Sequence, residues 1–139
     1  MGVIRTQIKL ANTFDVISAR KGLITKEAIR QKDIVALVDT GCDTLAINEE
    51  ICKELGLSIA SVFPAELANG SVENVAMSEA VEVYFENRQT TCNAWVMPGS
   101  TEPLLGAIPI EGMDVVIDLA NQVLAVNPKH PGQKVLLLK

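Results

Sequence analysis

Short runs of apolar residues, separated by turn signals, follow one another along most of the chain. Alternation of apolar and polar positions predicts a half-buried strand, and a short continuous apolar run predicts a strand buried on both faces. On these criteria we expect strands at 3–10, 15–19, 34–38, 44–47, 62–68, 71–77, 80–86, 90–97, 115–118, 122–126 and 135–138. Many short strands with regular turns favour a closed or sandwiched β fold.

Three of these segments carry more specific expectations. The run 34–38 is continuously apolar, so it predicts a strand that is buried on both faces and ends at Asp39. In 80–86 the side chains of Val81, Val83 and Phe85 share one face, and we expect Glu82, Tyr84 and Glu86 to point the other way. Residues 23–31 fit either a helix or a strand, and the context favours a strand.

Helix signals are few. Asn48 has the character of an N-cap, the acids Glu49 and Glu50 suit a first turn, and Gly56 supplies a stop. These residues predict a helix over 49–55, and 108–113 could form one helical turn. Asn69-Gly70 is the strongest hairpin-turn signal in the chain.

Length and composition favour one domain, 1–139, with 48% apolar residues and a net charge of −5. The three cysteines are an odd number at wide spacings, which argues against a disulfide framework and for a reducing, cytoplasmic location. No signal peptide or membrane-spanning run is evident. Basic residues are scattered, which disfavours nucleic-acid partners. No cluster suits a metal, and we expect no cofactor.

Asp39 is the main candidate for chemistry. It follows a buried strand and precedes Thr40-Gly41, where the glycine permits a tight turn. A partly desolvated acid in this position suits acid–base work. An aspartate that caps its own turn is the alternative, and it is the commoner arrangement for Asp-x-Gly.

The segment 36–45, with Asp39-Thr40-Gly41-Cys42-Asp43, resembles the active-site loop of the retropepsin-like aspartic proteases. The resemblance is closest to the small single-domain members of prokaryotes. Leu104-Leu105-Gly106 is similar to the segment that supports this loop, and the Asn69-Gly70 hairpin lies where the family has its flap. The resemblance implies a closed acid-protease β-barrel with one or two short helices.

The family mechanism needs two carboxylates, yet the chain has a single Asp-Thr-Gly. The resemblance therefore implies a homodimer that acts as an aspartic endopeptidase on a peptide or protein, with Asp39 from each chain activating a water. It also implies that Thr40 bonds across the dimer axis and that Gly41 lets substrate backbone approach. Asp43 would contact substrate backbone. The hairpin tip would cover an extended peptide, through Leu67, Ala68, Asn69 and Gly70.

Two departures from the family pattern bear on activity. Cys42 stands where the family usually has Ala, Ser or Thr, and Ala107 stands where retroviral relatives carry an arginine that pairs with the acid at Asp43. The main alternative function is a non-catalytic dimeric peptide-binding domain on the same fold. A Cys42/His130 thiol enzyme is a weaker alternative. We expect Cys52 and Cys92 in the core, Trp95 in the core or an interface, and dimer contacts from 3–10 and 135–138.

Overall fold

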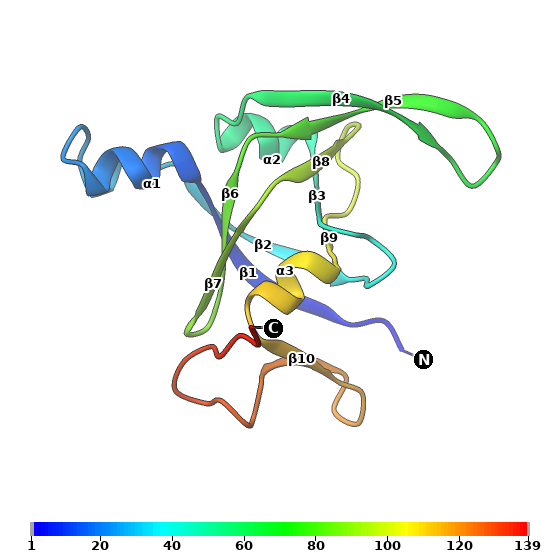
Figure 1. Ribbon diagram of the computed structural model, residues 1–139. Helices are drawn as coiled ribbons and strands as arrows, with labels where there is room; N and C mark the ends of the chain where they lie inside the picture. Colours follow the sequence, from blue (N-terminus) through cyan, green and yellow to red (C-terminus); the bar gives the residue numbers. More distant parts are fainter. Residues whose placement is uncertain (1, 139) are drawn as a thin grey trace.

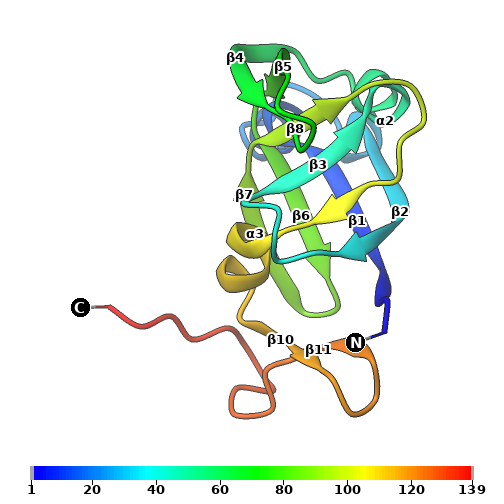
Figure 2. The ribbon, with the colours of Figure 1, turned by 90° about the vertical axis from the view of Figure 1, so that its right-hand side faces the viewer.

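The structure is a computed structural model that describes residues 2–138. Its main feature is a nine-stranded sheet with the order β4-β5-β8-β3-β9-β2-β1-β6-β7, and a second sheet pairs β10 with β11. The large sheet is strongly curled, and the small sheet lies below it (Figure 1). The expected mostly β fold is therefore confirmed. In Figure 2 the C-terminal segment runs away from the body of the molecule.

The bounds of the elements follow in chain order. They are β1 (Arg5–Asn12), α1 (Thr13–Arg20), the 3-10 helix η1 (Lys26–Ala28), β2 (Gln31–Val38), β3 (Leu45–Asn48), α2 (Glu49–Glu54), β4 (Ile59–Glu66), β5 (Val72–Ser78), β6 (Val81–Phe85), β7 (Arg88–Cys92), β8 (Ala94–Met97), β9 (Leu104–Leu105), α3 (Ala107–Gly112), β10 (Val115–Asp118) and β11 (Val123–Val126). The three α-helices within 2–138 exceed the one or two expected.

Strands that are distant in sequence meet in the middle of the sheet. β2 is antiparallel to β1 and parallel to β9, whereas β3 is antiparallel to β9 and parallel to β8. The core lies within the curl and is built mainly from aliphatic side chains, among them Ile8, Leu10, Leu45, Ile47, Leu55, Val81, Val83, Leu105 and Met113. Cys52 and Cys92 are buried, as expected. No helix in the described part of the chain could span a membrane.

The strand predicted at 15–19 is wrong, because this segment belongs to α1. The Asn12 side chain caps the helix by accepting a bond from the Asp15 N–H at 3.1 Å. Asp15 in turn accepts bonds from the backbone and side chain of Arg30, at 2.8 to 3.0 Å. Cap and ion pair outweigh the β propensity of Val16 and Ile17. The strand favoured at 23–31 is also wrong, since η1 occupies its middle.

Three predictions about strands need correction. The strand β2 is not buried on both faces, since Ile34 and Ala36 are buried whereas Val35 is 55% exposed. Glu82 does not face solvent; it is buried and accepts bonds from Thr13, Gln89 and Thr91. The predicted strand 90–97 is divided at Asn93 into β7, which pairs with β6, and β8, which pairs with β3 and β5.

Other elements agree with the sequence. Asn48 caps α2 by accepting a bond from the Ile51 N–H at 2.9 Å, and Gly56 at the end of this helix has a φ of 63°. Asn69 and Gly70 turn β4 into β5, with a φ of 84° at Gly70. The predicted helical turn is α3, and β10 and β11 form the expected pair.

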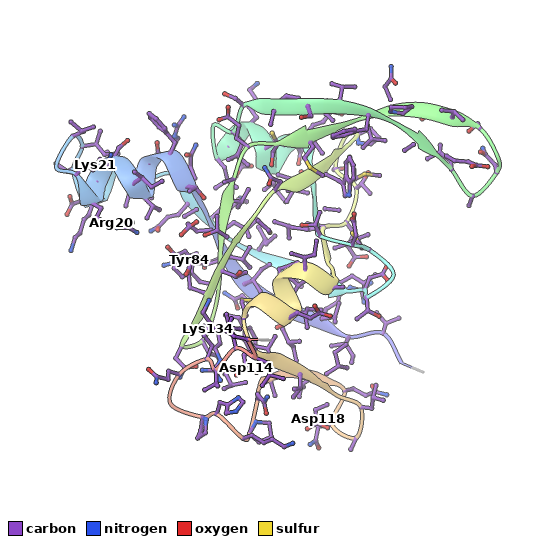
Figure 3. All side chains as sticks on the ribbon, in the orientation of Figure 1. Arg20, Lys21, Tyr84, Asp114, Asp118 and Lys134 are labelled. Atoms are coloured by element: carbon purple, nitrogen blue, oxygen red, sulfur yellow. The ribbon has the colours of Figure 1, made fainter. Side chains whose placement is uncertain are left out.

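The predicted strand at 135–138 is absent from the structure, where these residues have no regular pairing. The segment is instead fastened by Asp114, whose carboxylate accepts bonds from the Val135 N–H at 3.0 Å and from Asn127 at 2.9 Å. His130 Nδ1 lies 2.7 Å from the same carboxylate. Figure 3 shows Lys134 close to Asp114, and Lys134 Nζ donates to the carbonyl of Gly112.

Candidate active site

The catalytic candidate Asp39 follows the last residue of β2. Two neighbouring segments fix its backbone: the Asp39 N–H donates to the carbonyl of Leu105 at 2.9 Å, and the Val38 N–H donates to that of Ile4 at 2.8 Å. β2 and β9 also pair side by side at Leu37–Leu104 and Val38–Leu105. The apolar pair Leu104-Leu105 therefore supports the position from which the carboxylate projects.

The Asp39 side chain also closes its own turn. Its Oδ1 accepts the Gly41 N–H at 2.9 Å, and its main-chain carbonyl accepts the Cys42 N–H at 3.1 Å. Within residues 2–138 no hydrogen bond engages Oδ2. The turn-capping interpretation and the catalytic one are thus compatible, since one oxygen orients the carboxylate while the other remains open.

Gly106 and the start of α3 hold the far side of the loop. The N–H groups of Ala107 and Ile108 donate to the carbonyls of Cys42 and Asp43, both at 2.9 Å. A Cβ atom at Gly106 would overlap the carbonyl oxygens of Thr44 and Cys42. The glycine is therefore required by close backbone approach, which gives the Leu-Leu-Gly pattern a steric reason.

Cys42 is half-buried, and its Sγ donates to the carbonyl of Thr44 at 3.1 Å. Burial raises the pKa of the Cys42 thiol, and the charges of Asp43 and Asp39 raise it further. The thiol therefore stays protonated at neutral pH, which is unfavourable for a nucleophile. His130 is bonded to Asp114 instead, so the structure does not join Cys42 and His130 in a hydrogen-bonded pair.

Asp43 is exposed at the end of the loop and accepts a hydrogen bond from Trp95 Nε1 at 2.8 Å. The sequence left the partner of this acid open because Ala107 replaces the arginine of retroviral relatives. Trp95 was not foreseen in this role. The available signal was its indole N–H, which usually finds a partner when the ring is partly covered.

The predicted flap residues, Leu67, Ala68, Asn69 and Gly70, form the tip of the β4–β5 hairpin. Their hydrogen bonds are internal, with Leu67 N–H donating to the carbonyl of Ser71 at 2.8 Å and Ser71 N–H to Asn69 Oδ1 at 2.9 Å. No hydrogen bond within 2–138 joins the tip to Asp39. Figure 1 shows the hairpin extending to the same side as the loop after β2.

Thr40 and Gly41 are exposed beside Asp39. A pocket of about 470 Å³ adjoins them, and Asp39 and Thr40 are its polar members. Its remaining lining is mainly apolar and comes from the N-terminal segment, β2 and the β10–β11 region: Gly2, Val3, Ile4, Leu37, Val38, Ile117 and Leu119. Among residues 2–138 no group of three or more His, Cys, Asp and Glu side chains could hold a metal ion.

Comparisons with known proteins bear on the family and the fold of the chain. A family model described as gag-polyprotein putative aspartyl protease matches residues 25–110, which is more than half of the chain. The retroviral protease-like domain of Ddi1 from Leishmania major is similar in structure, with a TM-score of 0.52 and 13% identity over 70% of this chain and 81% of that chain. This likeness supports the fold alone.

A retropepsin-like aspartic protease from Rickettsia conorii is 18% identical over 85% of this chain and 87% of that chain, with a TM-score of 0.46. No curated protein matches the sequence. The family match confirms the predicted resemblance to the aspartic proteases. The predicted acid-protease fold is also confirmed. The roles of individual residues stay predictions.

Proposed function

The chain belongs to the gag-polyprotein putative aspartyl protease family, and on this premise we propose that it is an aspartic endopeptidase formed by two copies of the chain. The observation that carries the proposal is the loop after β2. There the Asp39 carboxylate is oriented by the Gly41 N–H through Oδ1, and its other oxygen is open. Support from Leu105 and Ala107 keeps the loop in this conformation.

A single carboxylate is half of the required chemistry. Two aspartates placed together share one proton, because two close negative charges cannot both form cheaply. The ionised aspartate removes a proton from a water, whose oxygen attacks the carbon of the scissile carbonyl. The protonated aspartate gives its proton to the carbonyl oxygen. Collapse of this intermediate breaks the C–N bond, and a proton passes to the leaving amine.

The second carboxylate comes from Asp39 of another copy, because the chain contains one Asp-Thr-Gly. An isologous interface around the loop places the two aspartates on one axis. Thr40, exposed beside Asp39, would then bond across this axis. The pair titrates as one coupled system, and cleavage is favoured at acid pH, where the pair holds one proton.

Exposed apolar side chains near the loop support this assembly. Val3 is 63% exposed and Leu119 60% exposed, and both line the pocket that contains Asp39. The two-stranded β10–β11 sheet is a further surface for pairing. The termini were expected to contribute. At the N-terminal end, Lys9, Leu10 and Ala11 of β1 are paired with both β2 and β6. Residues 5–8 of this strand pair with β2 alone, so β1 offers one unpaired edge only before Lys9.

The substrate that suits this arrangement is an extended, unstructured peptide. Such a peptide would lie between the loop after β2 and the β4–β5 hairpin, and it would be recognised through its backbone as an added strand. Asp43 would accept bonds from its N–H groups, Gly41 would permit close approach, and the tip, 67–70, would cover it. A cytoplasmic location remains part of this proposal, based on the unpaired cysteines.

The decisive variant is Asp39→Asn, assayed for cleavage of an unfolded protein across acid to neutral pH. We expect cleavage to be abolished while the molar mass in solution stays that of a dimer. Asp33→Asn is the matched control, because Asp33 is an exposed aspartate on β2, the strand that precedes Asp39, and it should retain activity. Alkylation of the thiols should not remove the Asp39-dependent activity.

Two results would contradict the proposal. Cleavage that survives Asp39→Asn but is lost on alkylation would favour a thiol enzyme. A wild-type dimer that binds unfolded protein without cleaving it at any pH would favour the non-catalytic peptide-binding domain.

A further inference from the structure

Trp95 lies where the hairpin and the loop after β2 approach each other. It belongs to β8, which pairs with hairpin strand β5 on one side and with β3, the strand that follows the loop, on the other. In register, Trp95 is opposite Met77 of β5 and Ala46 of β3. The residue therefore belongs to the backbone framework of both candidate substrate-binding elements.

Two contacts fix the indole ring. Its Nε1–H donates to Asp43 Oδ1 at 2.8 Å. The indole ring also packs against the ring of Phe63 of β4 in a T-shaped arrangement, with ring centroids 5.9 Å apart and an interplanar angle of 80°. Aromatic pairs of this geometry contribute beyond their buried area, so the ring plane and the direction of the N–H are both restrained.

The indole N–H that Trp95 donates to Asp43 belongs to an uncharged side chain. Within residues 2–138 no Lys, Arg or His side chain forms an ion pair with Asp43. The bond to Trp95 engages Oδ1, and no hydrogen bond in the described part of the chain engages Oδ2. Asp43 is thereby oriented without its charge being cancelled, and one oxygen is left to accept a bond.

We propose that Trp95 is a positioning residue for substrate binding, which aims the carboxylate of Asp43 at the peptide backbone. The inference rests on the proposed peptidase function, in which Asp43 binds the substrate. Trp95 acts through Asp43 and does not contact the reacting atoms. Loss of its N–H should therefore weaken peptide binding and leave the chemical step at Asp39 unchanged.

Steady-state kinetics on a peptide substrate provide the first test. Trp95→Phe keeps an aromatic ring beside Phe63 but removes the donor, and we expect KM to rise about five- to tenfold with kcat within about twofold of wild type. A merely structural role would lower kcat and the fraction of folded enzyme together. An unchanged KM, or a loss confined to kcat, would overturn the inference.

A second-site variant offers rescue. The N–H of Ile108 donates to the Asp43 carbonyl, so position 107 adjoins the acid, and Ala107 is half-buried. Adding Ala107→Arg to Trp95→Phe supplies a new donor for Asp43, and we expect KM to return most of the way to wild type. Failure of Ala107→Arg to lower KM would count against positioning through Asp43.

Fluorescence tests the contact without turnover, because Trp95 is the one tryptophan in the chain. Asp43→Ala removes the hydrogen-bond acceptor and should shift the tryptophan emission. Asp33→Ala, which alters an exposed aspartate on β2, should leave the emission unchanged. Equal emission in both variants would overturn the inference even if Trp95→Phe fails to fold.

The kinetic and fluorescence tests together distinguish failure of this inference from failure of the proposed peptidase function. If wild type cleaves peptide but Trp95→Phe has the wild-type KM, the inference fails and the peptidase proposal stands. If wild type cleaves nothing although Asp43→Ala shifts the emission, the peptidase proposal fails, and the role of Trp95 in substrate binding falls with it, while the contact between Trp95 and Asp43 stands.

Discussion

At the scale of single residues, Gly106 offers the sharpest steric prediction. A methyl group at this position would overlap two backbone carbonyls, those of Cys42 and Thr44, which belong to the loop that carries Asp39. Because backbone cannot rotate away as a side chain can, we expect Gly106→Ala to lower the free energy of unfolding by about 2–4 kcal/mol and to abolish cleavage. Urea unfolding followed by circular dichroism measures the first effect.

Gly132→Ala is the matched control for this variant. An added methyl group at Gly132 meets open space, so its stability and activity should equal those of wild type. A Gly106→Ala protein with wild-type stability would show that the loop and the start of α3 are more loosely joined than the hydrogen bonds of Ala107 and Ile108 indicate.

Asp114 provides a prediction about pH. Hydrogen bonds from the Val135 N–H and Asn127, together with His130, hold the pKa of Asp114 down to about 2. In the unfolded chain this carboxyl group has the ordinary aspartate pKa of about 3.9. The stabilisation is therefore fully present above about pH 3.9 and is lost as the pH falls towards 2. In Asp114→Asn, stability should depend less on pH between 5 and 2.

Thermal unfolding of wild type and Asp114→Asn at several pH values within that range gives the comparison. Asp33→Asn, which alters an exposed carboxylate on β2, should follow the wild-type curve. Parallel curves for wild type and Asp114→Asn would mean that the carboxylate does not fasten the 135–138 segment in solution.

The residues that sequence could identify are those with local signals. Asp39 and Gly41 lie two positions apart in one turn, and Asn48 caps the helix that follows it directly. Trp95 and Asp43 are 52 positions apart, and nothing in the local pattern of either residue specifies the other. Their contact depends on the parallel pairing of β3 with β8, which is a property of the folded sheet.

At the scale of elements, the errors have a common cause in tertiary contacts. The segment 15–19 has β-branched residues typical of a strand, but Asn12 caps it and Arg30 binds Asp15, so a helix forms. Likewise the sequence predicts one strand over 90–97, yet the strand is divided at Asn93. Its side chain donates to the Ser78 carbonyl, and its own carbonyl accepts from Thr44. Periodicity alone does not contain these long-range bonds.

The β4–β5 hairpin is the element whose proposed role, covering a bound peptide, can be tested. Gly70 has a φ of 84°, a conformation that costs an L-residue about 1 kcal/mol or more. We expect Gly70→Ala to raise amide hydrogen exchange in the tip and to raise KM for peptide, with little change in global stability. Ser71→Ala, adjacent to the turn, is a comparison variant that removes the hydroxyl bond to Asn69 Oδ1 at 2.6 Å but imposes no φ strain. If amide hydrogen exchange in the tip is the same in Gly70→Ala as in wild type, the conformation of Gly70 does not determine how ordered the tip is.

At the scale of the whole molecule, the exposed apolar surface near Asp39 predicts self-association. Leu119 is 60% exposed in the pocket that contains Asp39, and a lysine placed there would have its charge buried without a partner in a dimer. We expect Leu119→Lys to weaken dimerisation at least about tenfold and to reduce cleavage at low protein concentration. Sedimentation across micromolar concentrations measures the first effect.

Leu23→Lys is the control, because Leu23 is 74% exposed but lies after α1, on another part of the chain. It should dimerise as wild type does. Equal dissociation constants for wild type and Leu119→Lys would place the interface elsewhere, for example at the apolar tail 135–138.

The bonds that shape the Asp39 loop come from late in the chain, and this has a consequence for the order of events during synthesis. A ribosome that has released Asp39 has not yet made Leu105, Ala107 or Ile108, whose backbone groups bond to the loop. Contacts so distant in sequence close slowly, because chain entropy must be overcome first. The nascent chain therefore carries an unformed Asp39 loop until these later residues have been made, and any chemistry proposed for the loop has to wait for them.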